Sequence, residues 1–225
     1  MSKQARGQAT TDRVLDAALA CFVRDGVQGA TIQDIAARSG VSIGSIYHHL
    51  GSRERILLEL YRRCLERMLA HVTRAVLRRR DARDGVRALV TSYLRFVEKH
   101  RAEALLIFAA AHTELTRDFR PELAELAARV TAPIAQWLAP HVAAGTVIAL
   151  PRPLYEVVLI GPAAEAARRI LSGAPGLSFT SARRVLPELV WSAVEVKRPG
   201  RRVRPRPEQR PSRPTARRAS ARPPR

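Results

Sequence analysis

The sequence has few cysteines, few aromatic residues and no long apolar run. Its two cysteines, Cys21 and Cys64, cannot form a disulfide framework in 225 residues, and neither lies in a Cys/His pattern with zinc spacing. No stretch approaches the roughly 18 consecutive apolar residues of a membrane-spanning helix, and the chain begins with polar residues rather than an apolar leader. These absences favour a cytoplasmic protein outside the membrane, with no metal site.

Motifs of the common enzyme classes are also missing. The chain has no glycine-rich dinucleotide or phosphate loop, no His-Glu-x-x-His helix and no Gly-x-Ser-x-Gly elbow. His112 and Glu114 are too isolated to form a catalytic pair. We therefore expect neither catalytic residues nor a cofactor.

Glycine and proline are sparse between residues 10 and 196, and apolar residues recur there at intervals of three and four rather than two. This spacing predicts an all-α protein of about nine helices. The first should begin at Thr10 or Thr11 and end at Gly26, and Pro133 and Pro162 should kink or divide two later helices. The later helices are expected at about 31–39, 42–50, 52–80, 84–99, 102–115, 121–143, 153–172 and 180–196.

Positive charge is concentrated at the C-terminus. The net charge is +19, and residues 197–225 hold twelve Lys and Arg against one Glu, with seven of the fifteen prolines. Such a segment cannot bury enough apolar surface to offset its ordering entropy, so we predict that it is disordered. Two interpretations stay open: an auxiliary phosphate-binding tail, or a solvated terminus extended by charge repulsion.

Residues 31–50 have the anatomy of a helix-turn-helix. Thr31 and Ser42 can cap its two helices, Gly40 suits the tight turn, and Ala36 is small where the helices cross. Small residues let the second helix approach a groove, while hydroxyl and imidazole groups can bond base edges or phosphates. We expect four residues to turn inward or sideways: Ile43, Ile46, Tyr47 and Leu50. The outward face then has no acid and consists of Gly44, Ser45, His48 and His49.

The stretch TIQDIAARSGVSIGSIYHHLGSRERIL, preceded by Phe22 and Gly26 at matching spacing, strongly resembles the tetracycline-repressor (TetR) family of transcriptional regulators. The resemblance is sharp over about 50 residues, and the remainder is similar only in the number and length of its helices. It implies a flexible arm at 1–9, a helix-turn-helix DNA-binding domain at 10–52 and an effector-binding and dimerisation domain at 53–196, before the tail at 197–225.

The resemblance also implies roles for residues of this sequence. Thr31, Tyr47 and Arg53 would bind phosphates, with Arg53 replacing the lysine usual in the family, which keeps the charge but changes the geometry. Facing the major groove would be Ser42, Gly44 and Ser45, with His49 near the backbone.

Each of these roles has an alternative. Tyr47 could belong to the core, His48 and His49 could be ordinary exposed residues, and Arg53 could form a surface pair with Glu54. Adjacent histidines on a helix point about 100° apart, so they cannot chelate one metal ion together.

By the same resemblance, helices four to seven would enclose a small-molecule effector. Few acids stand among the bulky residues available to line such a pocket, which favours a neutral or anionic apolar effector; a protein effector, or none, stays open. The candidate lining residues are Tyr93, Phe96, Phe108, His112, Phe119, Trp137 and Tyr155.

A single helix-turn-helix contacts only one half-site, which holds too few bases to identify an operator, so we expect a two-fold dimer. Its seam should lie on the last two helices, although these residues could instead pack only on their own chain. The candidates are Leu154, Val157, Val158, Gly161, Ala164, Leu171, Leu186, Leu189, Val190 and Ala193.

Together these features predict a sequence-specific, DNA-binding transcriptional regulator: a repressor released from a palindromic operator in double-stranded DNA by a small-molecule effector. The alternative is a sequence-independent nucleic-acid-binding protein driven by its basic tail. Both should bind more weakly as salt rises, but only the regulator should strongly prefer one palindrome over random DNA.

Overall fold

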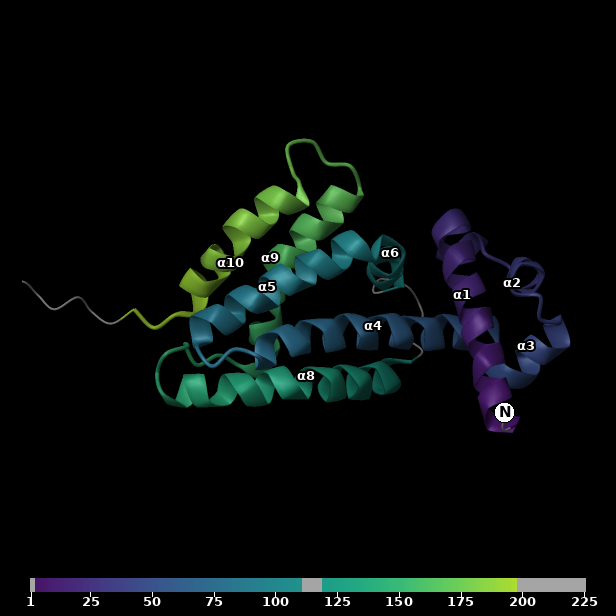
Figure 1. Cartoon of the computed structure of the whole chain (residues 1–225), viewed down its shortest axis with the longest axis horizontal. Coiled ribbons are helices and arrows are strands. Elements are labelled where there is room, and N and C mark those ends of the chain that lie inside the picture. Colours follow the sequence, from purple (N-terminus) through teal and green to yellow (C-terminus); the bar gives the residue numbers. More distant parts are fainter. Residues whose placement is uncertain (1–2, 111–118, 198–225) are drawn as a thin grey trace, which may run out of the picture.

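The computed structural model describes residues 3–110 and 119–197, and this part of the chain consists of helices joined by turns (Figure 1). One isolated β-bridge, between Val147 and Glu195, is the only β-pairing within it. The predicted all-α class is confirmed. The helices are α1 (Lys3–Gly29), α2 (Ile32–Ser39), α3 (Ile43–Leu50), α4 (Arg53–Leu77), α5 (Ala82–Lys99), α6 (Arg101–Ala110), α8 (Arg120–Ala143), α9 (Arg152–Leu171) and α10 (Phe179–Val194).

Side-chain caps explain where α2, α3 and α4 begin. The hydroxyls of Thr31, Ser42 and Ser52 each accept a hydrogen bond from the backbone N–H three residues later, which satisfies a helix donor that has no partner within the helix. Gly40 ends α2 with a φ of 66°, a left-handed conformation in which a residue with a Cβ is strained. The predicted starts of these helices are confirmed.

The predicted start of the first helix is wrong. α1 begins at Lys3, and the Thr10 hydroxyl donates to the Arg6 carbonyl at 3.0 Å, as a threonine inside a helix does. Residues 3–9 are therefore helical instead of forming the flexible arm expected at 1–9. Gly26 interrupts α1 as predicted, with a φ of 75°, and helical backbone resumes after it as far as Gly29.

Two later helices that contain a proline are continuous. α8 and α9 continue through Pro133 and Pro162, so neither proline divides its helix. Residues 111–118, which include His112 and the end of the helix predicted at 102–115, lie outside the described residues, as does the basic tail after Lys197.

α4 connects two groups of helices. In Figure 1, α1–α3 form one group around its N-terminal end, and the rest of α4 runs between α5 and α8, with α9 and α10 beyond α5. Fully buried residues lie in both groups, among them Ile35 and Ile46 in the first, Leu94 in the second, and Ile56 and Leu60 on α4. A displacement of α4 would therefore shift the contacts of both groups of helices.

A close contact between α5 and α8 gives a first prediction. A Cβ on Gly85 would lie 2.0 Å from Cζ2 of Trp137, whose indole N–H donates to the Arg79 carbonyl at 2.8 Å. We expect Gly85→Ala to lower the free energy of unfolding by about 1–2 kcal/mol, because the indole must leave its site. Urea unfolding measures this.

The matched control is Gly7→Ala, also inside a helix, whose new Cβ would meet only an ordinary contact, 3.9 Å from Cε1 of His49. It should be neutral or stabilising, because alanine favours a helix over glycine by roughly 1 kcal/mol. Equal unfolding free energies for the two variants would contradict the steric argument.

Candidate nucleic-acid interface

α3 has one buried side and one exposed side. Ile46 is fully buried against the core that also holds Ile35 and Val41. On the other side Tyr47 is 48% exposed, and nothing lies within 4 Å of a Cβ built on Gly44. Tyr47 is therefore not a core residue, and the helix backbone at Gly44 is open to close approach.

The remaining predicted residues of α3 lie around this exposed side. Ser42, His48 and His49 are exposed, and Ser45 is half-buried. Ile43 is 40% exposed, so it does not turn inward; α3 packs against its neighbours through Ile46 and, in part, Leu50.

Thr31 is exposed at the start of α2, and its hydroxyl is already engaged. Its Oγ1 donates to a carboxylate oxygen of Asp34 at 2.5 Å and accepts the Asp34 backbone N–H at 3.1 Å. A phosphate would compete with this capping box for the hydroxyl proton.

The charge of this part of the chain is nearly balanced. Residues 1–52 hold five Lys or Arg and four Asp. Arg24 bonds Asp25 at 2.7 Å and thereby lowers the pKa of that carboxyl. No acid lies on α3, so its exposed side offers hydroxyl and imidazole groups rather than charge.

Arg53 makes hydrogen bonds to its own chain. Its Nε donates to the Ala30 carbonyl at 2.9 Å, and one terminal nitrogen donates to the carbonyls of Gln28, at 3.3 Å, and Val27. The side chain is half-buried against the turn between α1 and α2, and it has no ion pair with Glu54 among the contacts of the described residues. Its role as a phosphate contact stays a prediction.

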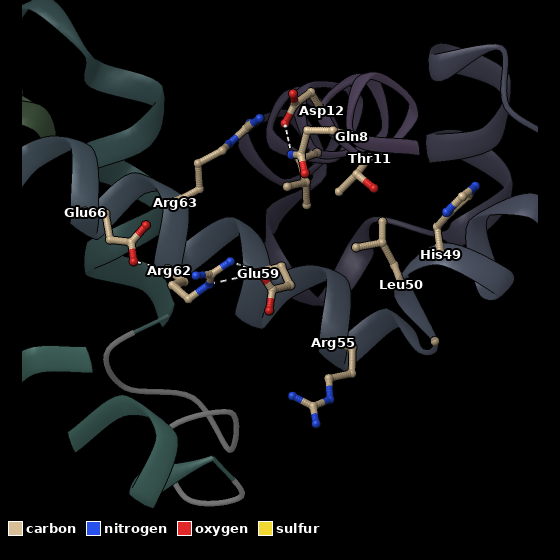
Figure 2. Close-up of a pocket in the computed structure, with 12 residues that line it drawn as sticks. Gln8, Thr11, Asp12, His49, Leu50, Arg55, Glu59, Arg62, Arg63 and Glu66 are labelled. Carbon is tan, nitrogen blue, oxygen red and sulfur yellow. Dashed lines mark hydrogen bonds and ion pairs between the residues drawn. The ribbon is translucent and has the colours of Figure 1, made fainter. Parts of the chain in front are cut away.

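A hollow lies between α1 and α4, beside the end of α3 (Figure 2). Its lining includes His49 and Leu50 from α3, but none of the seven residues predicted to line an effector pocket. The other lining residues are Gln8, Thr11, Asp12, Leu15, Gly51, Arg55, Glu59, Arg62, Arg63 and Glu66.

Two of the predicted pocket residues belong to the core of α5. Tyr93 and Phe96 are both 3% exposed, and burial raises the pKa of the Tyr93 phenol. The Phe96 ring lies 4.6 Å from the His100 ring and 5.7 Å from the His71 ring.

Two others make hydrogen bonds to the backbone. Trp137 binds the Arg79 carbonyl as described, and the Tyr155 hydroxyl donates to the Ile148 carbonyl at 2.8 Å. Phe108 and Phe119 are half-buried against the core, and His112 is outside the described residues. None of the described ones lines the hollow between α1 and α4.

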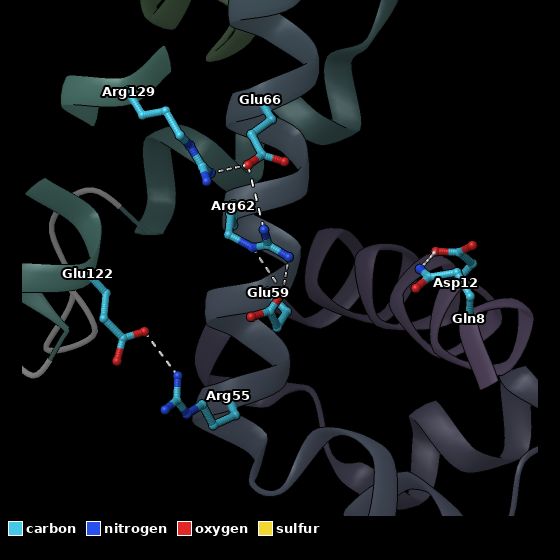
Figure 3. A network of polar contacts seen from close by, with 8 residues as sticks. All are labelled: Gln8, Asp12, Arg55, Glu59, Arg62, Glu66, Glu122 and Arg129. Carbon is cyan, nitrogen blue, oxygen red and sulfur yellow. Dashed lines mark hydrogen bonds and ion pairs between the residues drawn. The ribbon is translucent and has the colours of Figure 1, made fainter. Parts of the chain in front are cut away.

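Ion pairs join α4 to α8 (Figure 3). Arg55 binds Glu122 at 3.0 Å, and Glu66 binds Arg129 at 2.7 Å. Arg62, between them on α4, pairs with Glu66 at 3.6 Å. These side chains are partly solvent-exposed, so each pair contributes at most about 1 kcal/mol, but together they fix the position of α8 along α4.

The sequence analysis missed a buried acid, Glu103 on α6. It is 6% exposed, and one carboxylate oxygen accepts a hydrogen bond from Arg67 of α4 at 2.7 Å. The other oxygen is the one buried side-chain polar atom without a hydrogen-bond partner in the described part of the chain. An acid in the first turn of a helix is normally an exposed partner of the helix dipole, so the local pattern indicated nothing unusual.

The predicted dimer residues divide into three groups. Leu154, Val157 and Leu189 are 46%, 61% and 58% exposed, whereas Val190 is 2% exposed, so its assignment to the seam is wrong. Val190 faces inward because α10 packs against both α5 and α9. Ala193 is exposed, and the half-buried remainder is Val158, Gly161, Ala164, Leu171 and Leu186.

Across 3–110 and 119–197 no group of three or more His, Cys, Asp or Glu side chains could hold a metal ion. In those ranges no helix combines the length and the apolar character needed to cross a membrane.

Comparison with known proteins finds a similarity to one family in the N-terminal region of the chain. The model of the tetR family of bacterial regulatory proteins matches residues 14–60. The transcriptional repressor KstR2 of Rhodococcus jostii is 34% identical over 93 residues, which are 41% of this chain and 46% of that protein. The transcriptional activator FasR of Mycolicibacterium smegmatis is 31% identical over 96 residues, 43% of this chain and 44% of that protein. The chain thus matches about half the length of these curated relatives.

Solved structures extend the likeness to the whole fold. A TetR family transcription regulator from Marinobacter aquaeolei superposes with a TM-score of 0.71 at 18% identity, over 86% of this chain and 100% of that one. The regulator FadR from Bacillus subtilis, in complex with stearoyl-CoA, has a TM-score of 0.68 at 16% identity, over 81% and 98%. The N-terminal region is thus similar to the tetR family of bacterial regulatory proteins, and the chain shares the fold of solved TetR family regulators.

Proposed function

We propose that this protein is a sequence-specific transcriptional regulator that binds double-stranded DNA as a homodimer in the cytoplasm and is not an enzyme. The observation that carries the proposal is the exposed, acid-free side of α3, with Tyr47 48% exposed and Gly44 open. An acid there would repel phosphates, and a large side chain at residue 44 would keep the helix out of a groove.

Each exposed group has a proposed partner on DNA. Ser42, Gly44 and Ser45 face the base edges, Tyr47 and Thr31 bind phosphates, and His48 and His49 bind the backbone or the bases beside it. Because residues 1–52 are nearly neutral, most of these contacts come from neutral donors. Neutral hydroxyl and imidazole groups readily donate hydrogen bonds to phosphates, and these bonds position a protein on DNA without reading its sequence.

The regulator responds to a small apolar effector that is neutral or anionic. This part of the proposal is supported by FadR from Bacillus subtilis, whose structure contains stearoyl-CoA and whose fold this chain shares. The effector site belongs to residues 53–196. Repression is the expected mode, as in KstR2, while the relative FasR is an activator. A reporter assay with the regulator's gene present and deleted shows whether the protein represses or activates.

The experiment that tests the proposal is selection of DNA from a random pool by the purified full-length protein. The expected product is a palindrome whose half-sites are about one helical turn apart, bound at least about 10³-fold more tightly than random DNA. Selected sequences without symmetry, bound like random DNA, would favour the alternative of a sequence-independent protein that uses its basic tail.

Tyr47 gives a direct prediction for the interface. Tyr47→Ala should weaken operator binding by about tenfold for each half-site of the dimer, because it removes from each a hydrogen bond to a charged phosphate worth roughly 1–2 kcal/mol. Tyr47→Phe keeps the ring and removes only the hydroxyl, so it should lose nearly as much. Fluorescence anisotropy on the selected operator measures both, and wild-type affinity in a folded, dimeric Tyr47→Ala protein would contradict the assignment.

A further inference from the structure

Arg53 joins two parts of the chain that are far apart in sequence. It is the first residue of α4, directly after the N-cap Ser52. Its guanidinium donates to the carbonyls of Val27, Gln28 and Ala30, and its central carbon lies 5.9 Å from the centroid of the Phe22 ring, which is 4% exposed. One side chain of α4 thus binds the turn that leads from α1 into α2.

This turn needs donors from outside. Gly26 breaks α1 with its positive φ, and the Ala30 N–H to Gly26 carbonyl bond, at 3.3 Å, is long. Carbonyls at a helix end lack partners within the helix, and an arginine offers five N–H donors in a planar fork that can reach several of them. The residue after the turn is Thr31, the N-cap of α2.

Three of the five N–H donors of Arg53 are therefore already directed at carbonyls of its own chain. A phosphate would have to use the other terminal nitrogen of a half-buried side chain. A lysine could not reproduce this arrangement, because its ammonium is a compact charge with no planar fork.

The geometry points to Arg53 as a positioning residue that couples α4 to the turn before α2. α4 is joined to α3 through Gly51 and Ser52, so Arg53 gives it a second attachment, to the start of the neighbouring helix. Further along, α4 is tied to α8 by Arg55 with Glu122 and by Glu66 with Arg129. A displacement of α4 is thus transmitted to α2 and α3 together, and both keep their orientation for DNA. This inference rests on the proposed function for its DNA readout.

The test compares Arg53→Lys with Arg53→Ala in the full-length protein. If Arg53 positions the turn, both variants lose about tenfold in affinity for the selected operator, and the ratio of operator to random-DNA affinity falls in both. The slope of log affinity against log salt stays at the wild-type value, because no phosphate contact is lost. Amide hydrogen exchange at residues 27–35, measured without DNA, becomes faster in both.

Arg55 supplies the matched control, since it lies two residues further along α4 but binds Glu122. Arg55→Lys should leave exchange at residues 27–35 and operator preference as in the wild type. The proposal is overturned if Arg53→Lys keeps wild-type affinity while Arg53→Ala weakens operator and random DNA alike with a salt slope shallower by about one unit for each protomer, the signature of lost phosphate contacts.

Failure of the proposed function is distinguishable from failure of this inference. If the wild type selects no operator, the hydrogen exchange without DNA still reports on the turn. Unchanged exchange in a folded Arg53→Lys protein would overturn the coupling whatever the DNA result, and this conservative variant decides the question if Arg53→Ala does not fold.

Discussion

Replacing Val157 and Leu189 with glutamate should convert the protein into monomers and weaken operator binding by more than about 100-fold. The two side chains are 61% and 58% exposed, the most exposed large apolar residues of the described chain, and they lie on neighbouring helices, α9 and α10. Glutamates there would have to enter the dimer seam as like charges without partners. Because each monomer has one recognition helix, it would also lose the factor of about 10²–10⁴ that linkage of two half-site contacts provides.

The proposed seam is broader than these two residues. Leu154 lies one turn before Val157 on α9, and Val185, 45% exposed, lies one turn before Leu189 on α10. Apolar residues that gather on one face typically mark an interface, whereas scattered ones do not. Val190, by contrast, belongs to the core of the monomer, so a charge there would unfold the chain and say nothing about the dimer.

Leu77→Glu is the matched control for this experiment. Leu77 is 52% exposed at the end of α4, which is not one of the two seam helices, and should tolerate the same substitution with its dimer and its operator affinity intact. Sedimentation velocity gives the oligomeric state, and anisotropy gives the affinity. A wild-type monomer at operator-saturating concentration, or an unchanged dimer in the double variant, would refute the seam.

The features that could be predicted from sequence are those encoded locally. Thr31, Ser42 and Ser52 cap their helices through hydrogen bonds to the residue three positions later. Ile46 is buried because the spacing of apolar residues in α3 places it on the side that faces the core. The same reasoning placed the α1 start at Thr10, where it failed: a threonine suits a cap, but its hydroxyl can equally bond to the carbonyl four residues back.

Features that depend on distant contacts were beyond this reasoning. Arg53 meets carbonyls 23 to 26 residues earlier in the chain, and no spacing rule connects them. Val190 and Leu189 are adjacent and both apolar, yet one is buried and the other exposed. An apolar stripe indicates that one side of a helix is covered. Whether the same chain or a second copy covers that side depends on the tertiary arrangement.

Glu103 provides the second large prediction, an asymmetry between the two partners of one ion pair. Its carboxylate is almost fully buried and takes one hydrogen bond from Arg67 at 2.7 Å, with Nδ1 of His100 at 3.5 Å from the same oxygen. Arg67 itself is 54% exposed. Loss of Arg67 leaves a buried charge without its main partner, whereas loss of the Glu103 charge leaves a guanidinium that water can solvate.

We therefore expect Arg67→Ala to lower the free energy of unfolding by about 2–3 kcal/mol, somewhat less than the loss of a partner in a fully buried pair because Arg67 is half-solvated. Glu103→Gln keeps an acceptor for Arg67 and should change stability by less than about 1 kcal/mol. The double variant should regain most of what Arg67→Ala loses, because the buried charge has been removed along with its partner.

Urea unfolding of the four proteins gives this double-mutant cycle, and Arg62→Ala provides the control. Arg62 pairs with Glu59 at 2.7 Å, but both side chains are at least one-third exposed, so its removal should cost less than about 1 kcal/mol. Equal losses for Arg67→Ala and Arg62→Ala would mean that Glu103 finds water or another donor once Arg67 is gone. A double variant as unstable as Arg67→Ala would show instead that the arginine stem, packed along α4, matters more than its charge. Only a buried, unpaired carboxylate predicts both the large single loss and its recovery.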